Sequence, residues 1–201
     1  MIKERFLPAV ETRISLGACA ELNNMSLTKK NILVTGLPGV GKTTLIKELC
    51  SELKRYRPCG FYTEELREGG VREGFELVSL DGVRTTLAHQ NIETAYRVGK
   101  YKVDVVAFEK FLATVNFLEP EGGPIIIDEI GEMECLSRKF KEIIKRILDS
   151  EKVVVATIAF KGGGLIGDLK KRGDVKLFET TKVTRDFLLP EILDEVEKLL
   201  P

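Results

Sequence analysis

A glycine-rich octapeptide is the segment of this chain best suited to hold phosphate. It reads Gly36-Leu37-Pro38-Gly39-Val40-Gly41-Lys42-Thr43 and fits the pattern G-x-x-x-x-G-K-[ST]. Glycines let backbone N–H groups point inward without Cβ clashes, and the positive end of a following helix attracts the same anion. We expect Lys42 to reach the β- and γ-phosphates of a nucleotide and Thr43 to bind Mg²⁺ through its hydroxyl, with Thr44 completing the segment.

A second candidate segment is an apolar run that ends in two acids, Ile125-Ile126-Ile127-Asp128-Glu129. We expect Asp128 to hold Mg²⁺, directly or through water. Successive side chains of a strand point to opposite faces, so Glu129 is then free to face the γ-phosphate. A carboxylate placed there can orient a water molecule and accept its proton. The alternative is that Glu129 is an ordinary loop carboxylate.

Three further side chains are candidates for the same site. Thr157 lies at the end of an apolar run, where its hydroxyl would contact the γ-phosphate or the attacking water. The alternative is that Thr157 is simply a β-branched residue that fits a strand. Lys161 precedes three glycines and is a candidate mobile cation, or else a solvated loop lysine. Arg185 is a candidate to stabilise the charge of the transferring phosphoryl group. Its alternative is a surface ion pair with Asp186 or Glu179.

Apolar runs that alternate with amphipathic segments must position these residues. We expect strands at 32–35, 59–63, 125–128, 153–158 and 175–178, and helices at 43–56, 105–118, 140–148, 165–172 and 186–200, with Pro190 in the first turn of the last helix. Asp81-Gly82 between two β-prone runs predicts a hairpin, and the charged segment 64–73 is expected to be a surface loop. The prediction is one α/β domain with a mostly parallel sheet, helices on both faces and one antiparallel hairpin excursion.

Composition narrows the class of protein. The 201 residues include 31 basic and 31 acidic side chains, so the zero formal net charge does not indicate a nucleic-acid partner. Four cysteines without a C-x-x-C pair, and a single histidine, do not support a zinc site; free thiols favour the cytoplasm. No apolar stretch approaches the ~20 residues that a membrane helix needs. The oligomeric state stays open, with a monomer favoured.

The first 28 residues fit no predicted element. We therefore expect the nucleotide-binding domain to span residues 29–201. Met25 would start the chain immediately before the first strand, and our hypothesis is that residues 1–24 are a dispensable extension or reflect an upstream start site.

From about residue 31 to the end, the chain resembles a small P-loop nucleoside-triphosphatase family, the thermophile nucleoside-triphosphatase group that includes the human cancer-related nucleoside-triphosphatase. The matching pieces run in order: Gly36–Thr44, Gly60–Glu65, Gly74-Phe75, Tyr101–Asp104, Asp128–Glu134, Thr157-Ile158 and Arg185-Asp186. The Asp-Glu-Ile-Gly-x-Met-Glu piece is the most specific of them. Thr184 stands where the family usually has Asn, which weakens the assignment of that region to the site.

The resemblance implies a three-layer P-loop sandwich and slow Mg²⁺-dependent hydrolysis of ATP, GTP and other nucleoside triphosphates to diphosphate and phosphate, with loose base selectivity. A nucleoside or nucleotide kinase, with Lys170-Lys171-Arg172 as a cationic lid, is the second hypothesis. A kinase must exclude water, and a water-orienting Glu129 argues against it. A nucleotide-gated binding module with low intrinsic hydrolysis is the third. The absence of an [NT]-K-x-D segment argues against a guanine-selective switch.

Overall fold

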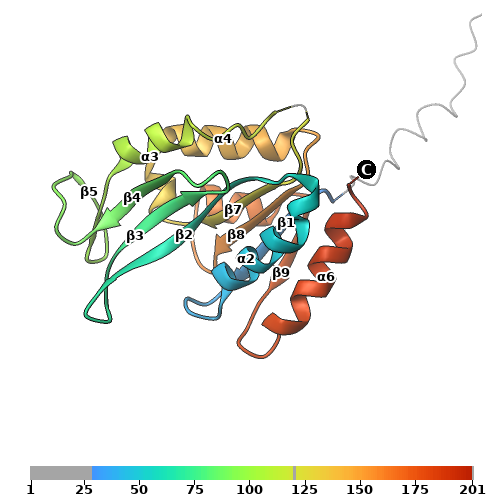
Figure 1. Cartoon of the computed structure of the whole chain (residues 1–201), viewed down its shortest axis with the longest axis horizontal. Helices are drawn as coiled ribbons and strands as arrows, with labels where there is room; N and C mark the ends of the chain where they lie inside the picture. The colour runs from blue at the N-terminus through green and yellow to red at the C-terminus, as the bar shows by residue number, and fades with distance from the viewer. Residues whose placement is uncertain (1–28, 120, 201) are drawn as a thin grey trace, which may run out of the picture.

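In a computed structural model of the chain, which describes residues 29–119 and 121–200, nine strands form one sheet flanked by helices (Figure 1). The strand order is β5-β6-β4-β3-β2-β7-β8-β1-β9. The bounds are β1 Asn31–Gly36, β2 Cys59–Glu68, β3 Val71–Ser79, β4 Arg84–His89, β5 Tyr96–Val98, β6 Tyr101–Val103, β7 Ile125–Ile130, β8 Val154–Ala159 and β9 Val175–Glu179. The first 28 residues, and with them the hypothesis of an upstream start site, lie outside the described part.

The five strands β2, β7, β8, β1 and β9 are parallel neighbours. The inner strands β7, β8 and β1 are buried almost throughout because helices cover both faces of this part of the sheet. Val34 pairs with Thr157, and Ile127 pairs with Ala156, so the carboxyl ends of β1, β7 and β8 meet at one edge. Ligands of open parallel sheets bind outside that edge.

Helices cover the two faces of the sheet in separate groups. α3, α4 and α5 pack on one face around the fully buried Phe61, whereas α2 and α6 pack on the other against Ile32 and Val34 (Figure 1). Their bounds are α2 Lys42–Glu52, α3 Val105–Leu112, α4 Arg138–Asp149, α5 Leu165–Lys170 and α6 Arg185–Glu197, with short 3₁₀ segments η2 Leu53–Tyr56 and η3 Glu134–Leu136. Among the described residues, no helix has the length and apolar character needed to cross a bilayer.

The predicted hairpin at Asp81-Gly82 is confirmed as the β3–β4 pair, but the surface loop predicted for 64–73 is wrong. That segment belongs to β2 and β3, which pair antiparallel around a turn at Gly69-Gly70, both with positive φ. Its charged side chains pair with one another across the two strands, as Arg72 does with Glu65 at 2.7 Å. The short strands β5 and β6 were also not predicted, because three residues carry too little periodicity.

Two helices end well before their predicted ends, and a proline in a third lies at another position than predicted. The first helix changes to 3₁₀ geometry at Leu53, and the helix expected to reach residue 118 ends at Leu112. Pro190 lies in the second turn of α6 and not in its first. Proline has no N–H, so the carbonyl of Asp186 loses its helical partner there.

Gly60 is the position where the parallel sheet leaves no room for a side chain. Its φ is +127°, and a Cβ added there would lie 1.8 Å from the carbonyl oxygen of Ile126 on β7. We expect Gly60→Ala to lower the free energy of unfolding by well over the ~1–2 kcal/mol that a left-handed conformation alone costs. Gly82→Ala is the control, because Gly82 has φ +90° with open space around it. Equal losses in urea denaturation would contradict the steric explanation.

Candidate functional site

The glycine-rich loop connects the carboxyl end of β1 to the start of α2. Gly39 and Gly41 have φ of +77° and +98°, which residues with a Cβ rarely adopt, and Gly41 caps the N-terminus of α2. Lys42 is 8% exposed. Its Nζ donates to the carbonyl of Gly36 at 3.1 Å and lies 3.6 Å from Glu129 Oε2. The loop therefore presents backbone N–H groups, a helix terminus and one buried cation to the same space.

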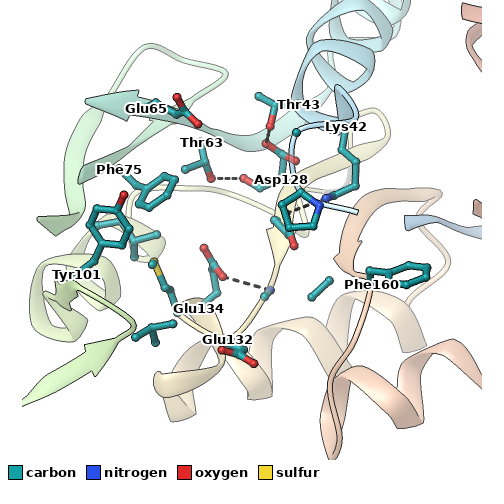
Figure 2. Close-up of a pocket in the computed structure, with 18 of the residues that line it drawn as sticks. Lys42, Thr43, Thr63, Glu65, Phe75, Tyr101, Asp128, Glu132, Glu134 and Phe160 are labelled. Carbon is teal, nitrogen blue, oxygen red and sulfur yellow. Dashed lines mark hydrogen bonds and ion pairs between the residues drawn. The ribbon is translucent and has the colours of Figure 1, made fainter. Parts of the chain in front are cut away.

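Asp128 is the residue on which four elements converge. Its carboxylate is 1% exposed and accepts hydrogen bonds from Thr43 at 2.7 Å and from Thr157 at 2.5 Å. Thr63 on β2 donates to the backbone carbonyl of Asp128 at 2.5 Å (Figure 2). Three hydroxyls from α2, β8 and β2 thus hold one acidic residue at the end of β7. Thr157 contacts Asp128 itself, beside the place expected for the γ-phosphate.

Burial governs the protonation of the two neighbouring acids. It raises the pKa of Asp128, and the hydrogen bonds from Thr157 and Thr43 oppose this rise. It also raises the pKa of Glu129, against the nearby charge of Lys42. A cation bound between Thr43 and Asp128 would reverse the effect on Asp128, because a metal ion stabilises the carboxylate form.

The oxygens at this point suit Mg²⁺. Mg²⁺ is usually held by one or two carboxylates together with substrate phosphates and water. Thr43 and Asp128 supply a hydroxyl and a carboxylate whose oxygens are 2.7 Å apart, next to the phosphate loop. In residues 29–119 and 121–200 no cluster of three or more acidic, histidine or cysteine side chains forms an all-protein metal site. The geometry therefore fits a cation shared with a phosphate ligand.

The two remaining candidate cations lie at different places. Arg185 lies against the loop, since a Cβ added at Gly41 would come within 2.6 Å of its Cδ. Its guanidinium forms an ion pair with Asp186 at 2.8 Å. Lys161 is exposed and lines the same cavity as the phosphate loop, after β8. The structure thus brings both to the loop region, with Arg185 already paired.

The proposed lid of Lys170-Lys171-Arg172 is divided in the structure. Lys170 turns toward the site, where its Nζ donates to the carbonyl of Phe160 at 2.8 Å and to Thr35 at 3.2 Å. Burial lowers the pKa of Lys170, and the charge of Glu129 opposes the shift. Arg172 pairs with Asp174 at 2.7 Å, near the start of β1 and away from the phosphate loop. These residues therefore do not act as one cationic cluster.

Glu134 is the main site residue that sequence reasoning left without a role. It follows β7 in η3, is 5% exposed, and its Oε2 accepts from the N–H of Gly131 at 3.2 Å. Burial raises its pKa from 4.5 to about 8, and the charges of Glu129 and Asp128 add to the rise. One sequence signal pointed to Glu134: it is the last residue of the Asp-Glu-Ile-Gly-x-Met-Glu motif.

Comparisons with known proteins agree with this geometry. Residues 31–193 match the model of a protein family described as NTPase. Nucleoside-triphosphatase THEP1 of Thermotoga sp. (strain RQ2) is 48% identical over 163 residues, which cover 81% of this chain and 92% of that protein. The crystal structure of THEP1 from Aquifex aeolicus superposes with a TM-score of 0.75 at 34% identity, over 83% of this chain and 99% of the other. A human cancer-related nucleoside triphosphatase, solved in solution, gives 0.73 at 37% identity, over 84% and 97%.

The buried carboxyl of Glu134 predicts a stability that falls with pH. Between its ordinary pKa of 4.5 and about 8, the unfolded chain has released this proton and the folded chain still holds it. The free energy of unfolding should therefore fall as pH rises through that range, by at most about 1.4 kcal/mol per pH unit from this group. Glu134→Gln should flatten the dependence in urea denaturation of nucleotide-free protein at pH 5 to 8. The exposed Glu132→Gln is the control, and a wild-type slope in Glu134→Gln would refute the assignment.

Proposed function

This chain belongs to the NTPase family, and we propose that it hydrolyses ATP, GTP and other nucleoside 5′-triphosphates to the diphosphate and phosphate, with Mg²⁺ as cofactor. The observation that carries the proposal is the arrangement around Asp128: the hydroxyl of Thr43 on one side and the carboxylate of Glu129 beside Lys42 on the other. Metal ligands and a candidate base thus meet at the end of one phosphate loop.

The loop supplies most of the binding. Backbone N–H groups of the segment 36–44, apart from Pro38, which has none, hold the α- and β-phosphates together with the N-terminus of α2. Lys42 neutralises charge on the β- and γ-phosphates. Thr43 and Asp128 are the residues that would hold Mg²⁺, and the ion would offset the negative charge that develops on the phosphate oxygens. We propose that Arg185, beside Gly41, adds positive charge to this end of the site.

Glu129 is the proposed water-orienting group. Its carboxylate reaches the same space as Lys42, and burial raises its pKa, which makes it a stronger proton acceptor at neutral pH. A water molecule held by Glu129 in line with the γ-phosphorus gives up its proton to the carboxylate as the new P–O bond forms and the bond to the β-phosphate oxygen breaks.

The proposal of broad base specificity rests on the sequence. The motif [NT]-K-x-D for guanine is missing, and Thr181-Lys182-Val183-Thr184 comes nearest but lacks the acid.

A cytoplasmic location is also proposed, supported by the free thiols of Cys50, Cys59 and Cys135.

A panel of nucleotides tests the main proposal. We expect phosphate release from ATP, GTP, CTP and UTP at rates within about tenfold of one another, since no base-reading motif is present. Excess EDTA should abolish release, and added Mg²⁺ should restore it. Strong preference for a single base would contradict broad specificity, and full activity in EDTA would contradict the metal.

Two substitutions separate binding from hydrolysis. Lys42→Ala should weaken triphosphate binding, because it removes the buried cation of the loop. Glu129→Gln should keep binding and reduce phosphate release by about 10²–10⁴-fold, the usual contribution of a general base. Titration with a fluorescent nucleotide analogue gives binding, and phosphate release gives hydrolysis. Glu132→Gln, an exposed carboxylate three residues along, is the control. Undiminished hydrolysis in Glu129→Gln would remove Glu129 from the mechanism.

A further inference from the structure

The cavity that contains the phosphate loop continues past Glu129 into a second part that the proposed hydrolysis does not use. The whole cavity has a volume of about 1080 Å³. Its second part, which we name the ring compartment, lies toward the antiparallel extension of the sheet (Figure 2). Its lining residues come from β3, β4, β5, β6 and the segment after β7: Phe75, Leu87, Val98, Tyr101, Met133 and Glu134.

Two aromatic rings form one wall of the ring compartment. Phe75 and Tyr101 meet edge to face, with ring centroids 5.1 Å apart at an angle of 72°. The hydroxyl of Tyr101 accepts a hydrogen bond from Arg72 Nε at 2.9 Å, so its polar tip is satisfied. Apolar and aromatic walls of this kind are typical of sites for small organic ligands. They favour a flat ring over a flexible polar chain.

The opposite wall carries one buried polar group. The carboxyl of Glu134 points into the cavity and is held by the N–H of Gly131 at 3.2 Å (Figure 2). Within residues 29–119 and 121–200 it forms no ion pair. A buried carboxyl without a cation is costly when ionised, and the raised pKa of about 8 keeps Glu134 protonated at neutral pH. A protonated carboxyl offers one donor and one acceptor side by side.

The cations at the rim of the ring compartment already have partners. Arg72 Nη1 pairs with Glu65 at 2.7 Å, and Arg72 also binds Tyr101. Lys100 donates to the backbone carbonyl of Arg72 at 3.3 Å and lies 5.2 Å from the centre of the Tyr101 ring. A phosphate would have to displace these contacts and would face Glu134. The compartment therefore favours an uncharged ligand.

The ring compartment lies on the γ-phosphate side of the site, a placement that rests on the proposed function. A phosphate loop cradles the α- and β-phosphates, and its lysine reaches the β- and γ-phosphates. The γ-phosphate end is therefore marked by Lys42, Asp128 and Glu129. The residues that follow Glu129 lead directly into the compartment. The nucleoside of the hydrolysed triphosphate extends in the other direction, so the compartment is not its base pocket.

We propose that the ring compartment binds a second, uncharged molecule that carries a planar heterocycle, of the chemical class of free nucleosides. The ring packs against Phe75 and Tyr101, and an edge with neighbouring N–H and acceptor atoms pairs with the carboxyl of Glu134. The bound molecule lies next to Glu129, on the γ-phosphate side of the hydrolytic site.

Direct binding of nucleosides to the full chain tests this proposal. Adenosine, guanosine, cytidine and uridine are titrated by calorimetry and by saturation-transfer NMR, each beside its 5′-monophosphate. We expect at least one nucleoside to bind more tightly than its monophosphate. Glu134→Ala and the compartment-filling Val98→Phe should each weaken binding about tenfold or more, whereas Glu134→Gln, which keeps a donor and an acceptor, should retain it. Val83→Phe, an exposed valine outside the cavity, is the matched control.

Three results would overturn the proposal that the ring compartment binds nucleosides. The absence of nucleoside binding at millimolar concentration overturns the proposal, as does binding that neither Glu134→Ala nor Val98→Phe reduces while circular dichroism shows both to be folded. Binding of monophosphates alone would show an anion site and also overturn it. Lys42→Ala separates this inference from the proposed function: it should weaken triphosphate binding and keep nucleoside binding. Unchanged triphosphate hydrolysis in Lys42→Ala would count against the proposed function and leave the nucleoside result standing.

Discussion

The structure depends on how a buried carboxylate at the end of β7 is held. Asp128 is almost fully enclosed, and an ionised acid in that position is costly unless it is hydrogen-bonded. Thr43 of α2 and Thr157 of β8 meet this requirement through their hydroxyls, and Thr63 of β2 donates to the backbone carbonyl of the same residue. Each comes from a different element, so the parallel strands must be in register for the contacts to form. The interactions that stabilise this acid therefore also align the phosphate loop with it.

The charged residues next to Asp128 differ from it in burial. Lys42 lies between the loop carbonyl of Gly36 and the carboxylate of Glu129, with its Nζ 3.6 Å from Oε2 of that carboxylate. Glu129 is more exposed than Asp128, with 31% of its side chain accessible, which suits a group that exchanges protons with water. Two adjacent acids thus occupy different environments, one enclosed by hydroxyls and one facing the cavity. The proposed function assigns metal binding to the first and proton transfer to the second.

The antiparallel strands β3 to β6 enlarge the cavity beyond the phosphate loop. In the parallel part of the sheet, helices cover both faces, and the cavity of the phosphate loop lies at the carboxyl ends of the strands. Strands β3, β4, β5 and β6 continue the sheet beyond β2 and bring Phe75 and Tyr101 to the far end of that cavity. A site for triphosphate alone does not require this wall. The extension therefore adds an apolar surface to the cavity, facing the buried carboxyl of Glu134 in η3.

The sequence by itself determined the phosphate loop, the Asp128-Glu129 pair and the alternation of strands and helices, because these depend on local patterns of glycine, charge and apolar periodicity. It did not predict β5 and β6, and it predicted a loop for residues 64–73. Charged side chains that pair across a hairpin give the same sequence pattern as a solvent-exposed loop. The contacts of Thr63 and Thr157 with Asp128, the enclosure of Glu134 and the ring compartment were decided only by the tertiary structure. They join residues far apart in the chain, and such contacts depend on strand order and register, which local sequence patterns do not encode.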